Sequence, residues 1–307
     1  MQSNVPSEGT HEPHSAQYFG EERDYWWNSD FLELMAKRWE LDKVKTVLDV
    51  ACGVGHWGHL LSKLLPQDAR ISGIDMEKEW VEICKEKTKG QESRFEYMVG
   101  TAENIPFPNA SFDMVTCQTV LLHVKDVQVA IKEMLRVLKP GGLLAVVEPN
   151  NVCSELVFDT VTVKYPLEDI LKAIQFQLIC ERGTAKLGIG SGSIGDLIPF
   201  YFSQSGLQDI KVYLSDKACL ICPPYATREQ QVYIQQLKDW FKDELLIWNK
   251  EDTRKYYLAG GGDEKDFEPT WNLLKKRFQS QINAIEEGNY AHPGSTIFYL
   301  ISGRKAK

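Results

Sequence analysis

Residues 46–58 constrain the fold of this chain more than any other stretch. They run Thr-Val-Leu-Asp-Val-Ala-Cys-Gly-Val-Gly-His-Trp-Gly, a short apolar run followed by three glycines at the spacing G-x-G-x-x-G. The run predicts a buried strand, and the amphipathic residues that continue to Leu65 predict a helix after the glycine turn. Glycines let the backbone turn sharply and approach a ligand at the positively polarised N-terminus of that helix. The spacing therefore predicts a ligand-binding turn, and an ordinary strand-to-helix turn is the alternative.

Two acidic residues indicate what this turn binds. Asp75 ends the next apolar run, 22 residues after Gly53, where a carboxylate can accept hydrogen bonds from both hydroxyls of a ribose. That feature suits NAD and S-adenosylmethionine equally. Asp49 stands four residues before the first glycine. A carboxylate there favours a cofactor that carries an ammonium group, because it would repel a pyrophosphate.

The segment Leu48–Gly55, Leu-Asp-Val-Ala-Cys-Gly-Val-Gly, resembles the first motif of the class I S-adenosylmethionine-dependent methyltransferases. A second signature of that family, Leu-Lys-Pro-Gly-Gly, stands at Leu138–Gly142, and the resemblance covers about residues 46–148. It implies S-adenosylmethionine as the cofactor and transfer of a methyl group to a small organic acceptor. A nicotinamide-dependent Rossmann oxidoreductase and a non-catalytic cofactor-binding regulatory protein stay open as alternatives.

Strands and helices alternate through this region, which predicts an α/β fold with parallel strands and right-handed crossovers. The resemblance implies a Rossmann-like sheet of seven strands, mostly parallel with an antiparallel last strand, and helical insertions that form a cap. The expected strands are residues 47–50, 71–74, 94–99, 112–117, 143–147, 210–214 and 295–302. The expected core helices are residues 56–65, 77–87, 127–138 and 196–205.

Ligands of such a sheet bind at the carboxyl ends of its strands. By the resemblance, we expect the cofactor to be bound by Tyr25, Asp49, Ala51, Gly53, Gly55, Asp75, Met76, Thr101, Ala102, Glu103 and Gln118. Thr101 departs from the family pattern, in which an aspartate often stands at this position and bonds the adenine amino group. Tyr25 and the adjacent Trp26 either fold over the ligands or only anchor the N-terminal segment to the core.

No nucleophile, triad or metal cluster is required for this chemistry, because a sulfonium carries an already activated methyl group. A base is needed only when the acceptor does not release its proton by its own acidity. The candidates for that role are His123, Glu148 and His292, and the catalytic residue stays unknown. The alternative roles are a structural histidine at position 123 and a simple strand cap at Glu148.

The organisation outside the core follows from composition and helical spacing. Residues 1–15 are polar and predict a disordered tail, and residues 16–45 predict an N-terminal helical lid. The methyltransferase core is expected over residues 46–217 and 293–307, with an insertion over residues 151–194.

Two inserted segments carry helical patterns. In the first, residues 167–181 predict a helix, and the glycine-rich residues 188–193 predict a flexible hinge. Residues 218–292 predict a second insertion with amphipathic helices over 228–249 and 266–287. Its aromatic side chains suit a cap over a partly apolar acceptor, although helix packing alone would also explain them.

Bulk composition limits the partners. The net charge of −8 argues against a nucleic-acid partner, because no basic field is available to bind phosphates. The sequence contains no apolar run near the roughly 20 residues that a membrane span needs. Seven scattered cysteines predict reduced thiols in a cytoplasmic protein, and their spacing predicts no metal site. The sequence does not indicate the oligomeric state, the acceptor or the acceptor atom.

Overall fold

The computed structural model describes residues 19–246, 248–294 and 297–307. Its seven strands form one sheet in the order β3-β2-β1-β4-β5-β7-β6. β7 runs antiparallel to both of its neighbours, and the remaining pairs are parallel. The strands are β1 (Thr46–Val50), β2 (Arg70–Asp75), β3 (Phe95–Val99), β4 (Phe112–Gln118), β5 (Leu138–Asn150), β6 (Gln208–Leu214) and β7 (Ile297–Arg304). The predicted α/β class and sheet are confirmed.

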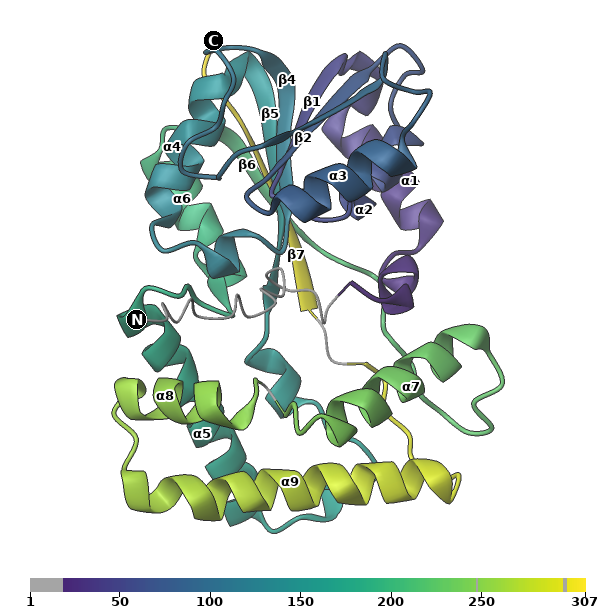
Figure 1. The fold of residues 1–307 in the computed structure, drawn as a ribbon, viewed down its shortest axis with the longest axis vertical. Coiled ribbons are helices and arrows are strands. Elements are labelled where there is room, and N and C mark those ends of the chain that lie inside the picture. Colours follow the sequence, from purple (N-terminus) through teal and green to yellow (C-terminus); the bar gives the residue numbers. More distant parts are fainter. Residues whose placement is uncertain (1–18, 247, 295–296) are drawn as a thin grey trace, which may run out of the picture.

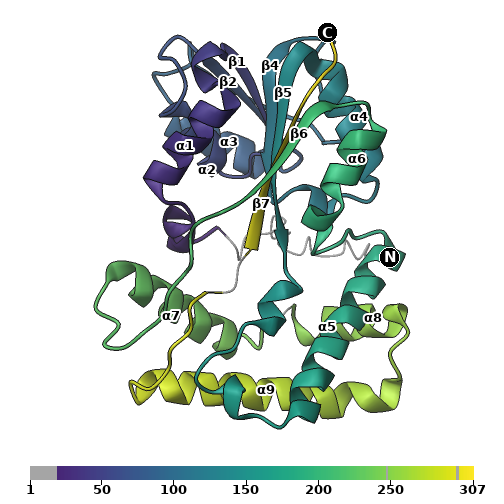
Figure 2. The same ribbon diagram turned by 180° about the vertical axis from the view of Figure 1, so that it is seen from behind.

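Helices cover both faces of this sheet (Figures 1 and 2). One layer contains α1 (Ser29–Trp39), α2 (His56–Ser62) and α3 (Lys78–Lys87), and the other contains α4 (Val127–Val137) and α6 (Ile198–Gln204). Successive residues of a strand point to opposite faces, so Val47 packs into the first layer and Leu48 into the second, both with no exposed surface. The glycine turn therefore follows the carboxyl end of β1, a central strand of a sheet that is covered by helices on both faces.

Several boundaries differ from the predicted ones. The helix predicted to Leu65 ends at Ser62, and β5 begins at Leu138 rather than at Leu143. Leu138 pairs with Phe112 before a shift of register, and the ladder resumes with Met114 and Leu143. The glycines of the second signature therefore lie inside an irregular part of β5. The predicted tail over residues 1–15 lies outside the described residues.

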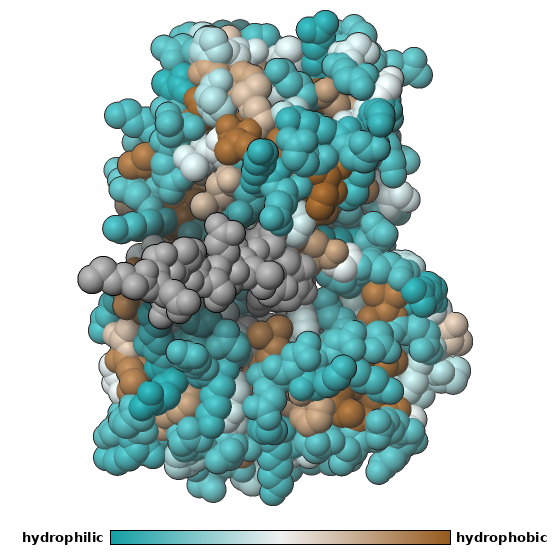
Figure 3. Space-filling view, in the orientation of Figure 1, coloured by the Kyte–Doolittle hydropathy of each residue, from teal (hydrophilic) through white to brown (hydrophobic). Residues whose placement is uncertain are grey.

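Four further helices form a layer beyond the carboxyl ends of the parallel strands, which we call the helical unit (Figure 1). They are α5 (Leu167–Leu187), α7 (Arg228–Lys242), α8 (Lys250–Gly260) and α9 (Glu264–Glu286). Phe176 on α5 stacks on Tyr257 of α8 with ring centroids 4.8 Å apart, and it also packs on Phe267 of α9 at 5.8 Å. The two inserted segments therefore pack as one unit, whose face in Figure 3 is mostly hydrophilic.

The helix predicted over residues 228–249 is confirmed over 228–242 and wrong over 243–249. α7 ends at Lys242, and a separate helix, α8, begins at Lys250 after an Asn249 cap whose side chain accepts from Asp252 N. α8 crosses α5 at glycine contacts, because a Cβ at Gly183 would lie 1.8 Å from the Tyr256 carbonyl oxygen. This close backbone contact holds α8 against α5. It explains why a short helix forms here although its sequence has little amphipathic pattern.

The glycine-rich residues 188–193 are not the flexible hinge that the sequence predicts. Gly188 caps α5 in the left-handed conformation, and Ser191 N donates to the Leu122 carbonyl oxygen at 2.9 Å. A Cβ at Gly190 would lie 1.9 Å from that same oxygen. The glycines therefore allow two backbone segments to pack closely, and they attach the helical unit to the loop after β4.

Among the described residues there is neither a membrane-spanning helix nor a cluster of metal ligands. None of the described helices combines the length and the apolar character that crossing a membrane requires. In the same part of the chain, no group of three or more His, Cys, Asp or Glu side chains is arranged to hold a metal ion.

Candidate functional site

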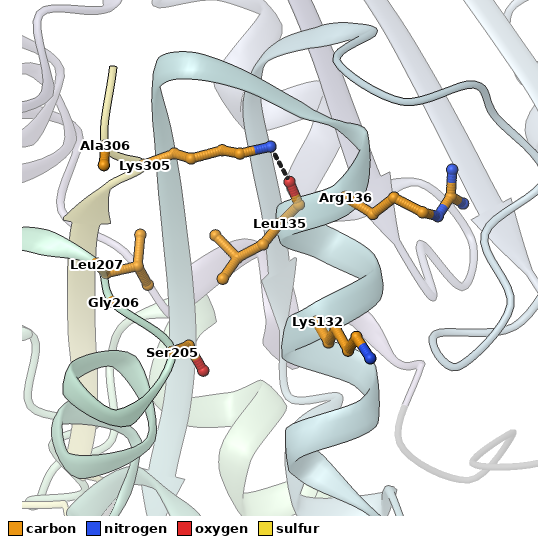
Figure 4. Close-up of a pocket in the computed structure, with 8 residues that line it drawn as sticks. All are labelled: Lys132, Leu135, Arg136, Ser205, Gly206, Leu207, Lys305 and Ala306. Atoms are coloured by element: carbon orange, nitrogen blue, oxygen red, sulfur yellow. Dashed lines mark hydrogen bonds between the residues drawn. The ribbon is translucent and has the colours of Figure 1, made fainter.

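A cavity of about 1400 Å³ lies between the carboxyl ends of the strands and the helical unit. The core contributes Asp49, Gly53, Asp75 and Gln118 to its wall, and the rest comes from the N-terminal segment and the helical unit. A smaller pocket of about 400 Å³ lies beside Leu135, Leu207 and Lys305, near the start of β5 (Figure 4). The smaller pocket is thus at the opposite end of the sheet, so the large cavity is the candidate site.

Asp75 organises the glycine turn. Its Oδ2 accepts from Gly53 N at 2.8 Å, and its Oδ1 accepts from Glu77 N at 2.9 Å. Gly53 has a φ of 52°, which glycine adopts without strain. The predicted residue Gly55 does not line the cavity; it has a φ of 80° and is the N-cap residue of α2. The carboxylate of Asp75 is therefore held in a fixed orientation at the cavity wall.

Asp49 lies under the same turn. Its Oδ2 accepts from Gly58 N at 3.0 Å, and only 2% of the residue is exposed. Burial raises the pKa of this carboxyl to about 7, although the Gly58 hydrogen bond opposes the shift, and the nearby Asp75 charge raises it further. A cation placed at this part of the cavity would restore the ionised form.

The residues predicted for the adenine end lie together along one wall of the cavity. Met76 is 63% exposed, and its side chain is available to cover a flat ligand. Thr101 and Glu103 are exposed, Ala102 between them is buried, and all three line the cavity. Ala51 completes this set in the turn itself.

Gln118 ends β4 at the middle of the cavity. The residue is 7% exposed, and within the described ranges of the chain neither its Nε2 nor its Oε1 has a hydrogen-bond partner. A buried amide without partners costs about 1–3 kcal/mol per group. Such a cost is tolerated at functional sites, where a ligand supplies the missing bonds. Gln118 is therefore the strongest structural sign of a bound ligand on this wall.

The prediction of Glu148 as a base needs correction. The residue has no exposed surface, and its Oε1 accepts from Val120 N and Leu121 N at 3.0 and 2.8 Å. Its Oε2 accepts from Leu122 N at 3.3 Å. Burial raises the pKa of Glu148 to about 7, against the opposing effect of these three bonds. The carboxyl is thus committed to holding the loop after β4, and it does not line the cavity.

The two histidine candidates do line the cavity. His123 is exposed and follows directly after the loop that Glu148 holds. His292 precedes β7; its Nδ1 accepts from Gly294 N at 3.3 Å, and its ring stacks beside Tyr290. Burial lowers the pKa of His292, so its imidazole is mainly neutral near pH 7. Both histidines thus belong to the cavity wall, where an acceptor group would bind.

The N-terminal segment closes one side of the cavity. Arg23 lies over the rings of Phe19 and Trp26, at 4.3 and 4.7 Å from the centroids, and all three residues line the cavity. Tyr25 points away from it: its ring packs on Tyr233 with centroids 6.5 Å apart, and its hydroxyl donates to Glu21. Trp26 is therefore placed to contact a ligand, whereas Tyr25 anchors the segment to α7.

Several cavity residues were missed from the sequence. Phe19 packs over Gly53, and a Cβ on that glycine would lie 2.7 Å from its ring. His56, at the start of α2, also lines the cavity, and burial lowers its pKa to about 4. Gln177 and Glu181 enter from α5. The many aromatic residues among the first 40 are a sequence signal for Phe19. Gln177 and Glu181 have no such signal, because their position at the cavity depends on how the inserted helix α5 packs against the core.

Comparison with known proteins agrees with this geometry. Residues 48–146 match the family described as a methyltransferase domain. They form a class I S-adenosylmethionine-dependent methyltransferase core. The chain is also 44% identical over 104 residues to demethylmenaquinone methyltransferase from Staphylococcus aureus. That match covers 34% of this chain and 43% of the relative, so the chain spans less than half the length of the curated relatives it matches.

Solved structures extend the likeness of fold beyond the core. The YcgJ protein of Bacillus subtilis superposes with a TM-score of 0.51 at 20% identity, over 91% of this chain and 100% of that protein. A second structure, from Bacillus halodurans, gives the same TM-score and coverage at 18% identity. At these identities the likeness concerns the fold alone.

Proposed function

We propose that this protein transfers a methyl group from S-adenosylmethionine to a small, partly apolar organic molecule. The observation that carries the proposal is the unpartnered amide of Gln118, buried on the same cavity wall as the Asp75 turn of a methyltransferase core. The family resemblance of the sequence implies that the methionine portion of the cofactor binds near Gln118. In this proposal Asp75 binds the ribose, and Met76 and the residues at 101–103 bind the adenine.

The proposed methyl transfer requires the protein mainly to bind and orient the cofactor and the acceptor. The sulfonium supplies an activated methyl group, and an in-line displacement needs the acceptor held close and dry. We expect Asp49 and Gln118 to bind the polar methionine end. Phe19 covers Gly53 of the turn, and Trp26 lines the cavity beside Arg23. The N-terminal segment and the helical unit act as lid and substrate cap.

The test is calorimetric titration of the full chain with S-adenosylhomocysteine, with NADH in a parallel cell. We expect micromolar binding of S-adenosylhomocysteine and no heat from NADH beyond dilution. Binding of NADH alone would overturn the proposal and favour an oxidoreductase. Cofactor turnover with candidate acceptors then distinguishes an enzyme from a cofactor-binding regulatory protein.

The raised pKa of Asp49 predicts a pH dependence of cofactor affinity. In the free protein this pKa is about 7, and a bound ammonium group lowers it, so binding releases a proton. The affinity for S-adenosylhomocysteine should therefore rise between pH 6 and 7.5, by up to about tenfold per pH unit. Asp49→Asn keeps an oxygen that accepts from Gly58 N and removes the titration. Equal pH slopes for the variant and the wild type would contradict this role.

A further inference from the structure

The part of the cavity formed by the helical unit contains acidic groups in unequal surroundings. The acidic residues that line it are Asp159, Asp169, Glu181 and Asp252, and the basic residues nearby are Lys125 and Arg277. Asp169 lies 3.9 Å from Lys172, and Asp252 accepts from Asn249 at the start of α8. Asp169 and Asp252 therefore have polar partners within the chain. The roles of Asp159 and Glu181 follow from their own hydrogen bonds.

Asp159 is saturated by groups of the chain. Its Oδ1 accepts from Val161 N and Thr162 N, each at 2.7 Å, and its Oδ2 accepts from Gln281 Nε2 at 2.6 Å. The Tyr290 hydroxyl approaches the same oxygen at 3.5 Å. This carboxylate holds the segment before α5 against α9, and it needs no ligand.

Glu181 is satisfied less fully. It is 9% exposed; its Oε1 accepts from Gln177 Nε2 at 3.0 Å, and its Oε2 accepts from Gly192 N at 2.8 Å. No ion pair to Glu181 occurs within the described ranges of the chain. Both partners are neutral, although a buried carboxylate is stabilised best by a charged donor.

The neighbouring Gln177 fixes the chemistry of the missing partner. Only 3% of this residue is exposed, it lines the cavity, and its Oε1 has no hydrogen-bond partner among the described residues. With Glu181 ionised, as it is when it binds a cation, the amide must point its Nε2 at the carboxylate, because the turned amide would bring its oxygen against a negative charge. Burial raises the pKa of Glu181, and a bound cation opposes that shift. The unpartnered atom is therefore an acceptor. An acceptor beside a carboxylate calls for a ligand that donates more than one hydrogen bond and carries positive charge.

The surroundings of this pair indicate the rest of the ligand. Trp248 and Tyr256 line the cavity and pack edge to face with ring centroids 5.1 Å apart, in the cluster that also includes Phe176 and Cys180 of α5. Trp240 and Phe278 line the cavity from α7 and α9. Aromatic faces attract cations as well as apolar groups. Gly192, which donates to Glu181, is adjacent to Ser191, whose N donates to Leu122 O in the loop after β4. A group held by Glu181 would thus lie beside the loop that borders the cofactor end of the cavity.

We propose that the acceptor molecule is an arylalkylamine, whose ammonium group is bound by Glu181 and Gln177 while its aromatic body lies among the aromatic side chains of the helical unit. This inference rests on the proposed function and names the substrate class of the same site. It concerns how the molecule is held, whichever of its atoms receives the methyl group.

The test compares three probes of matched shape on the full chain saturated with S-adenosylhomocysteine: tryptamine, tryptophol and indole-3-propionate. We expect calorimetry to give tryptamine an affinity at least about tenfold above the other two, because a charge-assisted hydrogen bond outweighs a neutral one. Glu181→Gln keeps an acceptor for Gly192 N and should abolish this preference. Glu168→Gln, an exposed change on the same helix, should preserve it.

The outcomes separate the two proposals. If S-adenosylhomocysteine does not bind, the proposed function fails. If it binds but tryptamine is bound no more tightly than its alcohol and acid analogues, only the amine inference is overturned. A retained preference in Glu181→Gln overturns it as well, and the wild-type comparison decides the matter even where that variant does not fold.

Discussion

Glu148→Ala should lose about 3–5 kcal/mol of unfolding free energy, the largest effect that we expect from one side chain of the core. The wild-type carboxyl accepts three backbone N–H bonds from Val120, Leu121 and Leu122 in a fully buried place. Alanine leaves these donors without an acceptor, and each buried orphan costs about 1–3 kcal/mol. Urea denaturation of the ligand-free protein measures the loss, and a change below 1 kcal/mol would contradict the structural role.

The pH dependence of that loss provides an internal control. The folded-state pKa of Glu148 is about 7, above its ordinary value of 4.5. A group with a raised folded pKa contributes stability that is present below pH 4.5 and is lost as the pH rises through 7. The difference between the wild type and Glu148→Ala should therefore be larger at pH 5.5 than at pH 8. The exposed substitution Glu96→Ala should show no such trend.

The core of the fold was predictable because local pattern and tertiary role agree there. The apolar runs that end at Val50 and Asp75 are buried strands, and the glycines between strand and helix occupy conformations that favour glycine. The helical unit was predicted only in outline. α8 has little amphipathic pattern, since it is held by its glycine contact with α5 rather than by an apolar stripe.

The site divides in the same way. Asp49, Asp75 and Gln118 follow directly from strand ends, and the structure brings all three to one cavity. Glu148 also lies near the carboxyl end of a strand. Its side chain, however, points toward the loop after β4, where three backbone N–H groups donate to it. Residue type and strand position cannot distinguish a carboxyl that faces a ligand from one that caps a loop. Glu181 shows the converse case, since its place depends on docking between distant segments.

Asp75→Ala should weaken binding of S-adenosylhomocysteine by about 2–3 kcal/mol, or roughly 30- to 160-fold. Two contributions add. The variant loses the proposed bonds to the ribose hydroxyls, and it also loses the acceptor for Gly53 N and Glu77 N, which fixes the turn. The substitution Asp68→Ala, at an exposed pair with Lys45, is the matched control and should leave the affinity unchanged.

A ligand that lacks one ribose hydroxyl separates these two contributions. The wild type should bind 2′-deoxy-S-adenosylhomocysteine about 10-fold more weakly than S-adenosylhomocysteine, because a bond to a charged acceptor is lost. In Asp75→Ala that bond does not exist, so the two ligands should bind alike. If the variant still distinguishes them as the wild type does, Asp75 only positions the glycine turn and another group binds the ribose. Equal binding by the variant, together with discrimination by the wild type, places the carboxylate on the ribose itself.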